Sequence, residues 1–277
     1  MEKQTKILLK GLRFPEGPRW HDNKLWFSDM WEGKVMTVDL ERNAEIIVEL
    51  QNYPSGLGWD PQGRLLIVSM QDRRLLRLDP EGLTEIADIS DLATYHCNDM
   101  VVDRHGNAYI GNFGFDITIN APFKPAEIIL VAPDGHARIV ADKMAFPNGS
   151  VITPDGSTLI VGETWSACLT AFNIEKDGSL TNRRIWARLR GGAVPDGICL
   201  DSEGGIWVAS PSTSEVLRVL EGGKVSDRIK IQDENSAYAC MLGGPSRKNL
   251  FICTSNDSRT NGRIEIIEVD FPGAGLP

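Results

Sequence analysis

The sequence contains 277 residues, with 29 Lys and Arg against 38 Asp and Glu, which gives a formal net charge of −9. This acidic balance excludes nucleic-acid binding as a function class, because the nucleic-acid backbone requires clustered cations. The length suits a single all-β domain with a substantial core, so we expect one domain over residues 1–277.

The N-terminal stretch MEKQTKILLKGL has charged residues around a very short apolar run. This run is too short for a signal peptide or a membrane span, so we expect a cytoplasmic protein without membrane association. Five cysteines make an odd count, and none of them forms a close pair with metal-site spacing. We therefore expect packed, reduced thiols.

One pattern recurs along the chain: a polar residue, usually followed by Gly, then an apolar strand, a turn and a second apolar strand. It starts at positions 16, 55, 98, 148 and 196, with a degenerate copy at 239, so the intervals run from 39 to 50 residues. This period is typical of four-stranded propeller blades. The six segments are EGPRWHDNKLWFSD, SGLGWDPQGRLLIVS, NDMVVDRHGNAYIGN, NGSVITPDGSTLIVGE, DGICLDSEGGIWVAS and ACMLGGPSRKNLFICTS.

Further strand candidates lie between the repeats, so each unit supplies about four strands. They are KVMTVDL and AEIIVEL, RLLRLDP and LTEIADI, EIILVAP and ARIVADK, CLTAFNI and RRIWARL, and EVLRVLE and KVSDRI. The last repeat is followed by a single strong strand, RIEIIEVDF. We expect the early strand TKILLKGL to pair with it and to close a six-bladed β-propeller.

The residue that opens each repeat should begin the innermost strand of its blade and face one mouth of the central channel. The six residues are Glu16, Ser55, Asn98, Asn148, Asp196 and Ala239. Asn and Asp before Gly are also common turn formers. Glu is a poor turn former, however, and each hairpin already has its own turn at the far end of the strand. A binding role for this ring therefore has to be considered.

Two carboxylates near a partly buried axis repel each other and lose hydration, which costs several kcal/mol per ion unless a cation compensates. Glu16 and Asp196 supply the negative charges, and Asn98 and Asn148 supply carbonyl oxygens. An all-oxygen set suits Ca²⁺, Mg²⁺ or Mn²⁺ better than zinc. The sequence therefore predicts an all-β six-bladed propeller with one divalent ion on its central axis.

Several motifs resemble the senescence marker protein, gluconolactonase and luciferin-regenerating enzyme family. They are FPEGPRW at 14–20, CNDMVVD at 97–103, PNGSVITPDG at 147–156, GETW at 162–165 and PDGICLD at 195–201. The resemblance implies a six-bladed propeller with one catalytic divalent metal, in a family whose members hydrolyse sugar lactones or, in relatives, organophosphates. Ca²⁺ is the expected ion, and Mg²⁺, Mn²⁺, Zn²⁺ and Fe²⁺ remain alternatives.

Carried over by motif, the resemblance assigns metal binding to Glu16 in PEGP, Asn148 in PNG and Asp196 in PDG. Asn98 matches a residue that contacts the metal or its bound water and substrate. Members acting on gluconolactone-like substrates tend to carry Arg two positions before this Asn, whereas this sequence has His96. His96 either donates to a substrate oxygen or packs beside Tyr95, and the sugar preference is open.

We expect the enzyme to open a lactone, a sugar lactone or related cyclic ester, with Asp196 as general base or as a pure ligand. Asn98 would orient the substrate or complete the coordination shell. Trp31, Phe113 and Trp165 are candidates for lining the substrate site, although aromatic residues are more often core. Residues 113–127 form the longest interruption of the repeat, so they are a candidate lid or an ordinary long connection.

Other functions are also consistent with this sequence. A phosphotriesterase on the same site and a non-catalytic metal-binding propeller are the alternatives to a lactonase. A nucleophilic Cys97 is disfavoured, because only His96 is near enough in sequence to activate it. No G-x-S-x-G motif for a serine hydrolase is present. The only partner that we expect is the small-molecule lactone, and the sequence does not indicate an oligomeric state.

Overall fold

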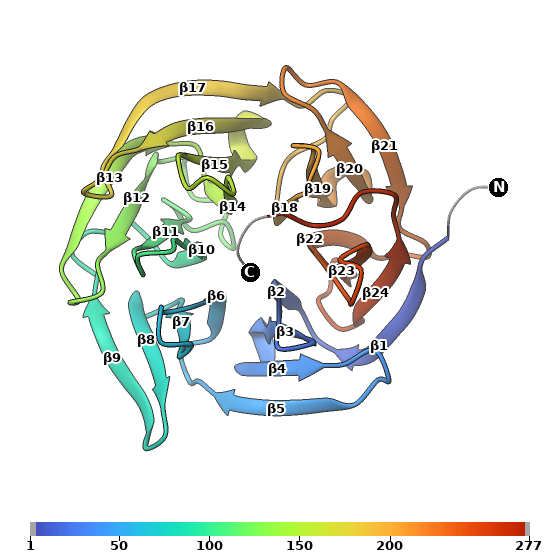
Figure 1. Ribbon diagram of the computed structural model, residues 1–277, viewed down its shortest axis with the longest axis horizontal. Coiled ribbons are helices and arrows are strands. Elements are labelled where there is room, and N and C mark those ends of the chain that lie inside the picture. Colours follow the sequence, from blue (N-terminus) through green and yellow to red (C-terminus); the bar gives the residue numbers. More distant parts are fainter. Residues whose placement is uncertain (1–3, 275–277) are drawn as a thin grey trace.

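The computed structural model of the protein describes residues 4–274 and shows six four-stranded antiparallel sheets around a central axis (Figure 1). The predicted all-β, six-bladed β-propeller is thereby confirmed. In each blade the strand order runs outward from the axis, and β2, β6, β10, β14, β18 and β22 are the innermost strands. Within the described residues, no helix is long and apolar enough to cross a membrane.

The strands follow the repeat pattern of the sequence. The first blade contains β2 (Pro15–His21), β3 (Lys24–Asp29), β4 (Lys34–Val38) and β5 (Ala44–Glu49). The second contains β6 (Pro54–Trp59), β7 (Leu65–Ser69), β8 (Arg74–Asp79) and β9 (Gly82–Asp88). The third contains β10 (Cys97–Val102), β11 (Ala108–Asn112), β12 (Ala126–Val131) and β13 (Ala137–Met144).

The remaining blades have the same arrangement. The fourth contains β14 (Pro147–Ile152), β15 (Thr158–Glu163), β16 (Cys168–Ile174) and β17 (Leu180–Arg188). The fifth contains β18 (Ile198–Leu200), β19 (Ile206–Ser210), β20 (Glu215–Val219) and β21 (Val225–Lys230). The sixth contains β22 (Ser236–Gly243), β23 (Asn249–Ser255), β24 (Gly262–Glu268) and β1 (Lys6–Leu12). Three short 3₁₀ helices are η1 (Met30–Glu32), η2 (Thr164–Ser166) and η3 (Pro211–Thr213).

The sixth blade combines the two ends of the described chain. β1 runs antiparallel to β24, with Lys6 opposite Ile266 and Leu12 opposite Gly262. The ladder hydrogen bonds of β1 therefore join the start of the propeller to its end. β1 is the outermost strand of this blade and lies on the rim of the ring (Figure 1).

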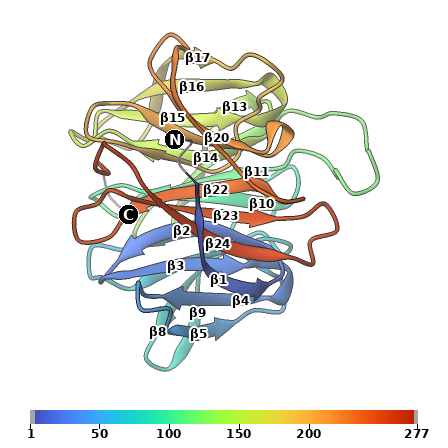
Figure 2. The same ribbon diagram turned by 90° about the vertical axis from the view of Figure 1, so that its right-hand side faces the viewer.

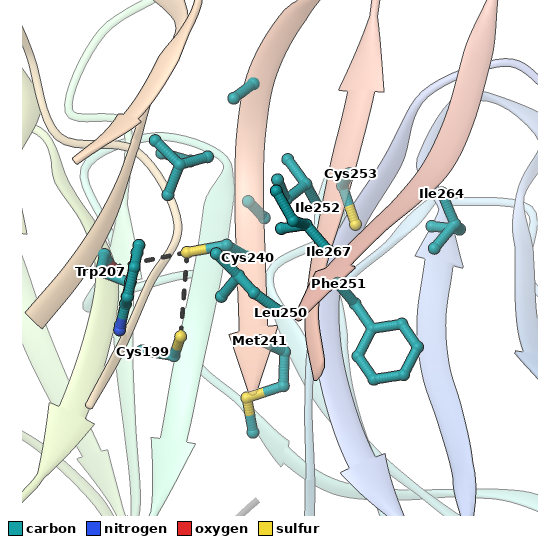
Figure 3. Packing of buried hydrophobic residues seen from close by; sticks show 14 of the residues in the cluster. Cys199, Trp207, Cys240, Met241, Leu250, Phe251, Ile252, Cys253, Ile264 and Ile267 are labelled. Atoms are coloured by element: carbon teal, nitrogen blue, oxygen red, sulfur yellow. Dashed lines mark hydrogen bonds between the residues drawn. The ribbon is translucent and has the colours of Figure 1, made fainter. Parts of the chain in front are cut away.

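Burial follows the position of a strand within its blade. The second strands β7, β11 and β19 are buried throughout, whereas the outermost strands β5 and β9 expose many residues. The second strands are covered on both faces by neighbouring blades, so they read as continuous apolar runs. Figure 3 shows one such contact, where Cys199 and Trp207 of the fifth blade pack against Cys240 of the sixth. All five cysteines are buried free thiols.

A register irregularity marks the first residues of the innermost strands. It falls between Glu16 and Arg19 in β2, and correspondingly between Cys97 and Met100 in β10 and between Pro147 and Ser150 in β14. A bulge leaves a residue out of the ladder and can redirect its side chain. The polar residues that open the repeats lie at these irregular positions of the strands. Their side chains can therefore point to the axis rather than to a neighbouring blade.

The glycines of the repeat allow the innermost strands to approach closely. A Cβ on Gly149 would lie 2.5 Å from the backbone nitrogen of Ile198 and 2.7 Å from the carbonyl oxygen of Asp196. Any side chain at this position would therefore push β14 away from β18. The recurring Gly of the repeat is thus a packing requirement, and the polar residue before it is a separate feature.

Candidate active site

A cavity of about 560 Å³ opens at one mouth of the central channel. All eight side chains proposed from sequence for metal, catalysis or substrate line it. They are Glu16, Trp31, His96, Asn98, Phe113, Asn148, Trp165 and Asp196. Residues from all six blades contribute to the wall, which includes Met70 of the second blade and Tyr238 of the sixth. The fold thus gathers at one place proposed residues as far apart in the chain as Glu16 and Asp196.

Two members of the expected polar ring do not line this cavity. Ser55 is buried, and its carbonyl oxygen accepts a hydrogen bond from the hydroxyl of Ser28. Ala239 occupies the glycine position of its repeat, against Gly197, and the residue that lines the cavity is Tyr238. The expectation for the sixth blade was therefore wrong by one residue. The degenerate repeat has no Gly at this point to mark the register.

Asp196 is held between two blades by its backbone. Its N–H donates to the carbonyl oxygen of Ala209 at 2.9 Å, and its own carbonyl oxygen accepts from the N–H of Gly149 at 3.2 Å. The next residue, Gly197, donates to the carbonyl oxygen of Tyr238 at 2.8 Å. These bonds fix the Asp196 side chain relative to the fourth and sixth blades.

The side chain of Asn148 is oriented by Thr164. The Thr164 hydroxyl donates to the carbonyl oxygen of Pro195 at 2.8 Å, so it can only accept from Asn148, whose Nδ2 lies 3.3 Å away. The Asn148 amide also hydrogen-bonds to the carboxylate of Asp196, which lowers the pKa of Asp196. Both amide protons are then used, and Oδ1 is the atom that remains available to a cation.

The two carboxylates of the site are strongly perturbed. Burial is the largest cause and raises the pKa of Asp196 to about 7, and the nearby charge of Asp99 adds to this rise. Burial also raises the pKa of Glu16 well above its usual range, with further contributions from Asp196 and Asp99. The positive charge of Arg259 opposes both shifts. The folded protein thus places two carboxylates where holding negative charge is costly.

The residues present fit a divalent cation that prefers oxygen ligands. Asn98 is almost fully buried, and its Nδ2 has no hydrogen-bond partner among the described residues. A cation bonds an amide oxygen and not an N–H group, so this buried donor needs the oxygen of a ligand or of water. In residues 4–274, no group of three or more His, Cys, Asp or Glu is placed to hold a metal. The candidate set has instead two carboxylates and two amides, which is the chemistry of a Ca²⁺ or Mg²⁺ site rather than of a zinc site.

A buried ion pair lies beside the carboxylates. Arg19 Nη2 and Asp99 Oδ1 are 2.8 Å apart, and Asp99 also accepts from the backbone N–H of Met100. Arg19 Nη1 donates to the carbonyl oxygen of Pro18. Asp99 therefore links β2 to β10 and adds negative charge next to Glu16 and Asp196.

Aromatic side chains form one wall of the cavity. Phe146 stacks on Phe113 at 4.8 Å and on Trp165 at 5.3 Å between ring centroids. Phe146 has a positive φ of 63°, which is unusual for a bulky residue and turns the chain immediately before Pro147 and Asn148. Trp165 is 53% exposed, so much of this aromatic surface faces solvent at the rim.

His96 contributes to the same region. Its ring stacks on Tyr95 at 4.1 Å and meets Phe113 edge-on at 6.5 Å. Burial lowers the pKa of His96, and the charge of Asp116 opposes this effect. His96 therefore presents a neutral imidazole to the cavity at neutral pH, and it packs beside Tyr95 as well as facing ligand space.

The candidate lid lies over this wall. The connection between β11 and β12 projects from one face of the propeller (Figure 2), and its residues Asp116, Ile117 and Thr118 line the cavity. Asp116 accepts from Thr118 and also hydrogen-bonds to Tyr95, and these bonds lower its pKa. Ile119 and Phe123 in the same segment are exposed.

Sequence reasoning missed several residues of the cavity, among them Thr164, Tyr238 and Arg259. Thr164 lies in the GETW motif, so the motif itself was a usable signal. Tyr238 could have been found by setting the sixth repeat one residue earlier. Arg259 lies in the connection between β23 and β24, and no pattern in the sequence marks it.

Comparison with known proteins identifies the family. A family model described as SMP-30/Gluconolactonase/LRE-like region matches residues 14–256. The chain belongs to this family. Within the SMP-30/gluconolactonase/LRE-like family, it is 26% identical over 263 residues to an uncharacterized protein of Sulfolobus acidocaldarius, which covers 93% of each chain.

Two further family comparisons have stated functions. A 6-deoxy-6-sulfogluconolactonase of Pseudomonas putida is 23% identical over 277 residues, covering 95% of this chain and 93% of the relative. The crystal structure of a calcium-binding protein, regucalcin, from Agrobacterium tumefaciens superposes with a TM-score of 0.84 at 20% identity. The superposition covers 100% of this chain and 97% of that one. At this identity the structural match shows a shared fold.

Proposed function

We propose that this protein is a divalent-metal-dependent hydrolase that opens lactones. The observation that carries the proposal is the convergence of Glu16, Asn98, Asn148 and Asp196, from four blades, at one end of an aromatic cavity. A family with a named lactonase supports the reaction class, and the calcium-binding description of the Agrobacterium protein supports Ca²⁺ as the ion. When bound, the ion supplies Lewis-acid polarisation of the ester carbonyl.

Each side chain of the site has a separate role in the proposed reaction. Glu16, Asn148 and Asp196 would hold the ion, and Asn98 would complete the set or orient the substrate. Asp196 also accepts a proton from the attacking water on a carboxylate oxygen, because a carboxylate at the edge of the ion can reach a water beside it. The unpartnered Nδ2 of Asn98 donates to the substrate oxygen that gains charge during attack.

The cavity wall indicates which lactones fit. A polyhydroxylated sugar ring requires several hydrogen-bonding partners, whereas the wall formed by Phe113, Phe146 and Trp165 offers aromatic faces. His96, where gluconolactone-active relatives tend to have Arg, removes one strong donor. We therefore infer a preference for lactones with an apolar substituent over simple aldonolactones.

The test uses the complete protein, stripped of metal by chelation and gel filtration. Ca²⁺, Mg²⁺, Mn²⁺, Zn²⁺ and Fe²⁺ are added back singly, and proton release is followed with aldonolactones, alkyl- and aryl-substituted lactones and a fluorinated phosphate ester. The matched variants are Asp196→Asn in the site and Asp155→Asn in the exposed turn after β14, where the carboxylate serves only local hydrogen bonds.

We expect metal-dependent lactone opening, with a loss of about a hundredfold or more in kcat for Asp196→Asn and no comparable loss for Asp155→Asn. Turnover of the phosphate ester alone would replace the proposal with a phosphotriesterase. Metal binding that raises the Tm without any turnover would show a non-catalytic propeller.

A further inference from the structure

One cationic side chain lies on the cavity wall opposite the aromatic stack. Arg259 lies in the connection between β23 and β24, and its guanidinium carbon sits 4.9 Å from the ring centroid of Phe14 and 5.0 Å from that of Trp31. Stacking on two rings holds the guanidinium plane while its N–H groups stay at the edge. Arg259 and both aromatic residues line the cavity.

This guanidinium forms no ion pair within the described part of the chain, although its positive charge acts on the carboxylates of Glu16 and Asp196. The ion pairs there engage other arginines, among them Arg13, Arg19, Arg183 and Arg218, but not Arg259. No hydrogen bond from its side chain is present within residues 4–274 either. An arginine in a carboxylate-rich protein of net charge −9 that leaves its five donors unused is available to a ligand.

A second donor on the same wall has no acceptor. The Nε1 atom of Trp31 is buried and has no hydrogen-bond partner among the described residues. Leaving a buried N–H unpaired costs free energy, so such a group is usually satisfied by water or by a ligand. Tyr238, which meets Phe14 edge-on at 4.6 Å, adds a phenol to this side of the cavity. Burial raises the pKa of Tyr238 to about 12, so the phenol keeps its proton.

One acidic and one basic side chain that line the cavity lie on different blades. Asp116 lies on the lid side, where Thr118 and Tyr95 hold its pKa low, and Arg259 lies on the side of the first and sixth blades. A divalent ion bound by Glu16 and Asp196 would neutralise the two carboxylates whose charge acts on Arg259. The wall at Arg259 then carries a positive charge, and it is the part of the cavity that attracts an anion.

We propose that Arg259 is a specificity-determining residue that binds a carboxylate at the end of the substrate's substituent, so that the preferred substrates are lactones whose apolar substituent ends in a carboxylate. This inference rests on the proposed lactonase function. The planar carboxylate pairs with the fork of the guanidinium, and Trp31 Nε1 supplies an additional donor. The opened ring also ends in a carboxylate, so the same chemistry has a second source, the product.

The experiment distinguishes a carboxylate on the substrate from the carboxylate that ring opening forms. It uses a pair of lactones with the same ring and the same substituent chain, ending in a carboxylate in one and in the isosteric primary carboxamide in the other. The wild type, Arg259→Gln, Arg259→Lys and Arg228→Gln are compared in the metal-loaded full chain. Arg228 is an exposed arginine that pairs with Glu215 on the fifth blade, so its substitution controls for loss of one positive charge.

The measured quantity is the ratio of kcat/KM for the carboxylate over the carboxamide. We expect this ratio to exceed one in the wild type, to fall about ten- to a hundredfold in Arg259→Gln and to recover in part in Arg259→Lys. Arg228→Gln should leave it unchanged. An unchanged ratio in Arg259→Gln overturns the proposal. If the ratio is unchanged because both lactones lose activity equally, Arg259 acts on a group that the two lactones share, the ring ester or the carboxylate that forms from it.

A binding measurement keeps this test separate from the lactonase proposal. Calorimetry with the carboxylate and carboxamide forms of an unreactive cyclic ether of the same shape requires no turnover. We expect the carboxylate to bind the wild type at least tenfold more tightly, with the preference lost in Arg259→Gln. If neither lactone is opened but this preference is present, the lactonase proposal fails and the anion site stands; equal binding of both ethers overturns the anion site.

Discussion

The hydroxyl of Thr164 fixes which end of the Asn148 amide faces the site. Its single proton is donated to the carbonyl oxygen of Pro195, so it accepts from Asn148 Nδ2 and leaves Oδ1 for the ion. Partners of this kind orient metal ligands and affect affinity strongly without touching the ion.

Replacing Thr164 by Val should weaken metal binding about ten- to a hundredfold, because the amide loses the acceptor that orients it. Calorimetric titration of the stripped protein with Ca²⁺ measures the effect. Thr213→Val is the matched control, since Thr213 lies in the 3₁₀ helix η3 of the next blade and bonds only to Ser210. Equal Ca²⁺ affinity in the Thr164 variant and the wild type would show that Thr164 has no orienting role.

The raised pKa of Asp196 predicts how the metal-free protein responds to pH. The folded-state pKa is about 7, above the ordinary value of about 4 in the unfolded chain. The protonated form therefore stabilises the fold, and this stability is fully present below pH 4 and is lost as the pH rises through 7. The high pKa of Glu16 acts in the same direction.

Asp196→Asn mimics the neutral carboxyl group and should remove part of this pH dependence. In urea unfolding without metal, we expect the stability of the variant to exceed that of the wild type by on the order of 2 to 4 kcal/mol at pH 8 and to differ little from it below about pH 4. Added Ca²⁺ should reverse the order at pH 8, because only the wild type binds it tightly. A metal-free wild type that is no less stable than the variant at pH 8 would contradict the burial argument.

The fold and the centre of the site were predictable because both depend on features that repeat. Glu16, Asn148 and Asp196 each precede a glycine that the close packing of inner strands requires, so strand register and axial position are encoded together. The aromatic residues Trp31 and Trp165 follow the second strands, where connections meet the cavity.

The parts that sequence did not reveal depend on contacts between connections. Arg259 reaches the cavity because the β23–β24 connection of the last blade lies next to Phe14 of the first blade, and only ring closure brings these segments together. Tyr238 was missed because the sixth repeat has Ala239 in place of the marker glycine. Local periodicity specifies strands, whereas these contacts depend on the geometry of loops.

The ion pair of Arg19 with Asp99 should act on both stability and metal binding. Asp99→Asn leaves a buried guanidinium without its carboxylate, which costs about 3–5 kcal/mol. The buried pair of Arg218 with Asp201, 2.6 Å apart and away from the cavity, provides the matched control in Asp201→Asn. Both variants should lose stability in urea unfolding.

Only the change at Asp99 should also lower Ca²⁺ affinity, by about tenfold, because its negative charge acts on Glu16 and Asp196. The Ca²⁺ affinities of the two variants are compared by calorimetric titration at a temperature where both remain folded. Parallel losses of affinity in the two variants would mean that general destabilisation, rather than local charge, explains the effect.

Trp165 tests the inferred preference for apolar substituents. Its side chain is 53% exposed at the rim and stacks on Phe146, so Trp165→Ala should cost little stability. Loss of an aromatic contact is worth about 0.5–1.5 kcal/mol, which predicts a KM about three- to tenfold higher for aryl-substituted lactones with little change in kcat. Ile185→Ala, a substitution at a 47% exposed residue of β17 outside the cavity, is the control. If KM rises equally for aldonolactones and aryl lactones, Trp165 shapes the site without selecting the substituent. The apolar preference would then have to come from other residues of the wall, or the inference would be wrong.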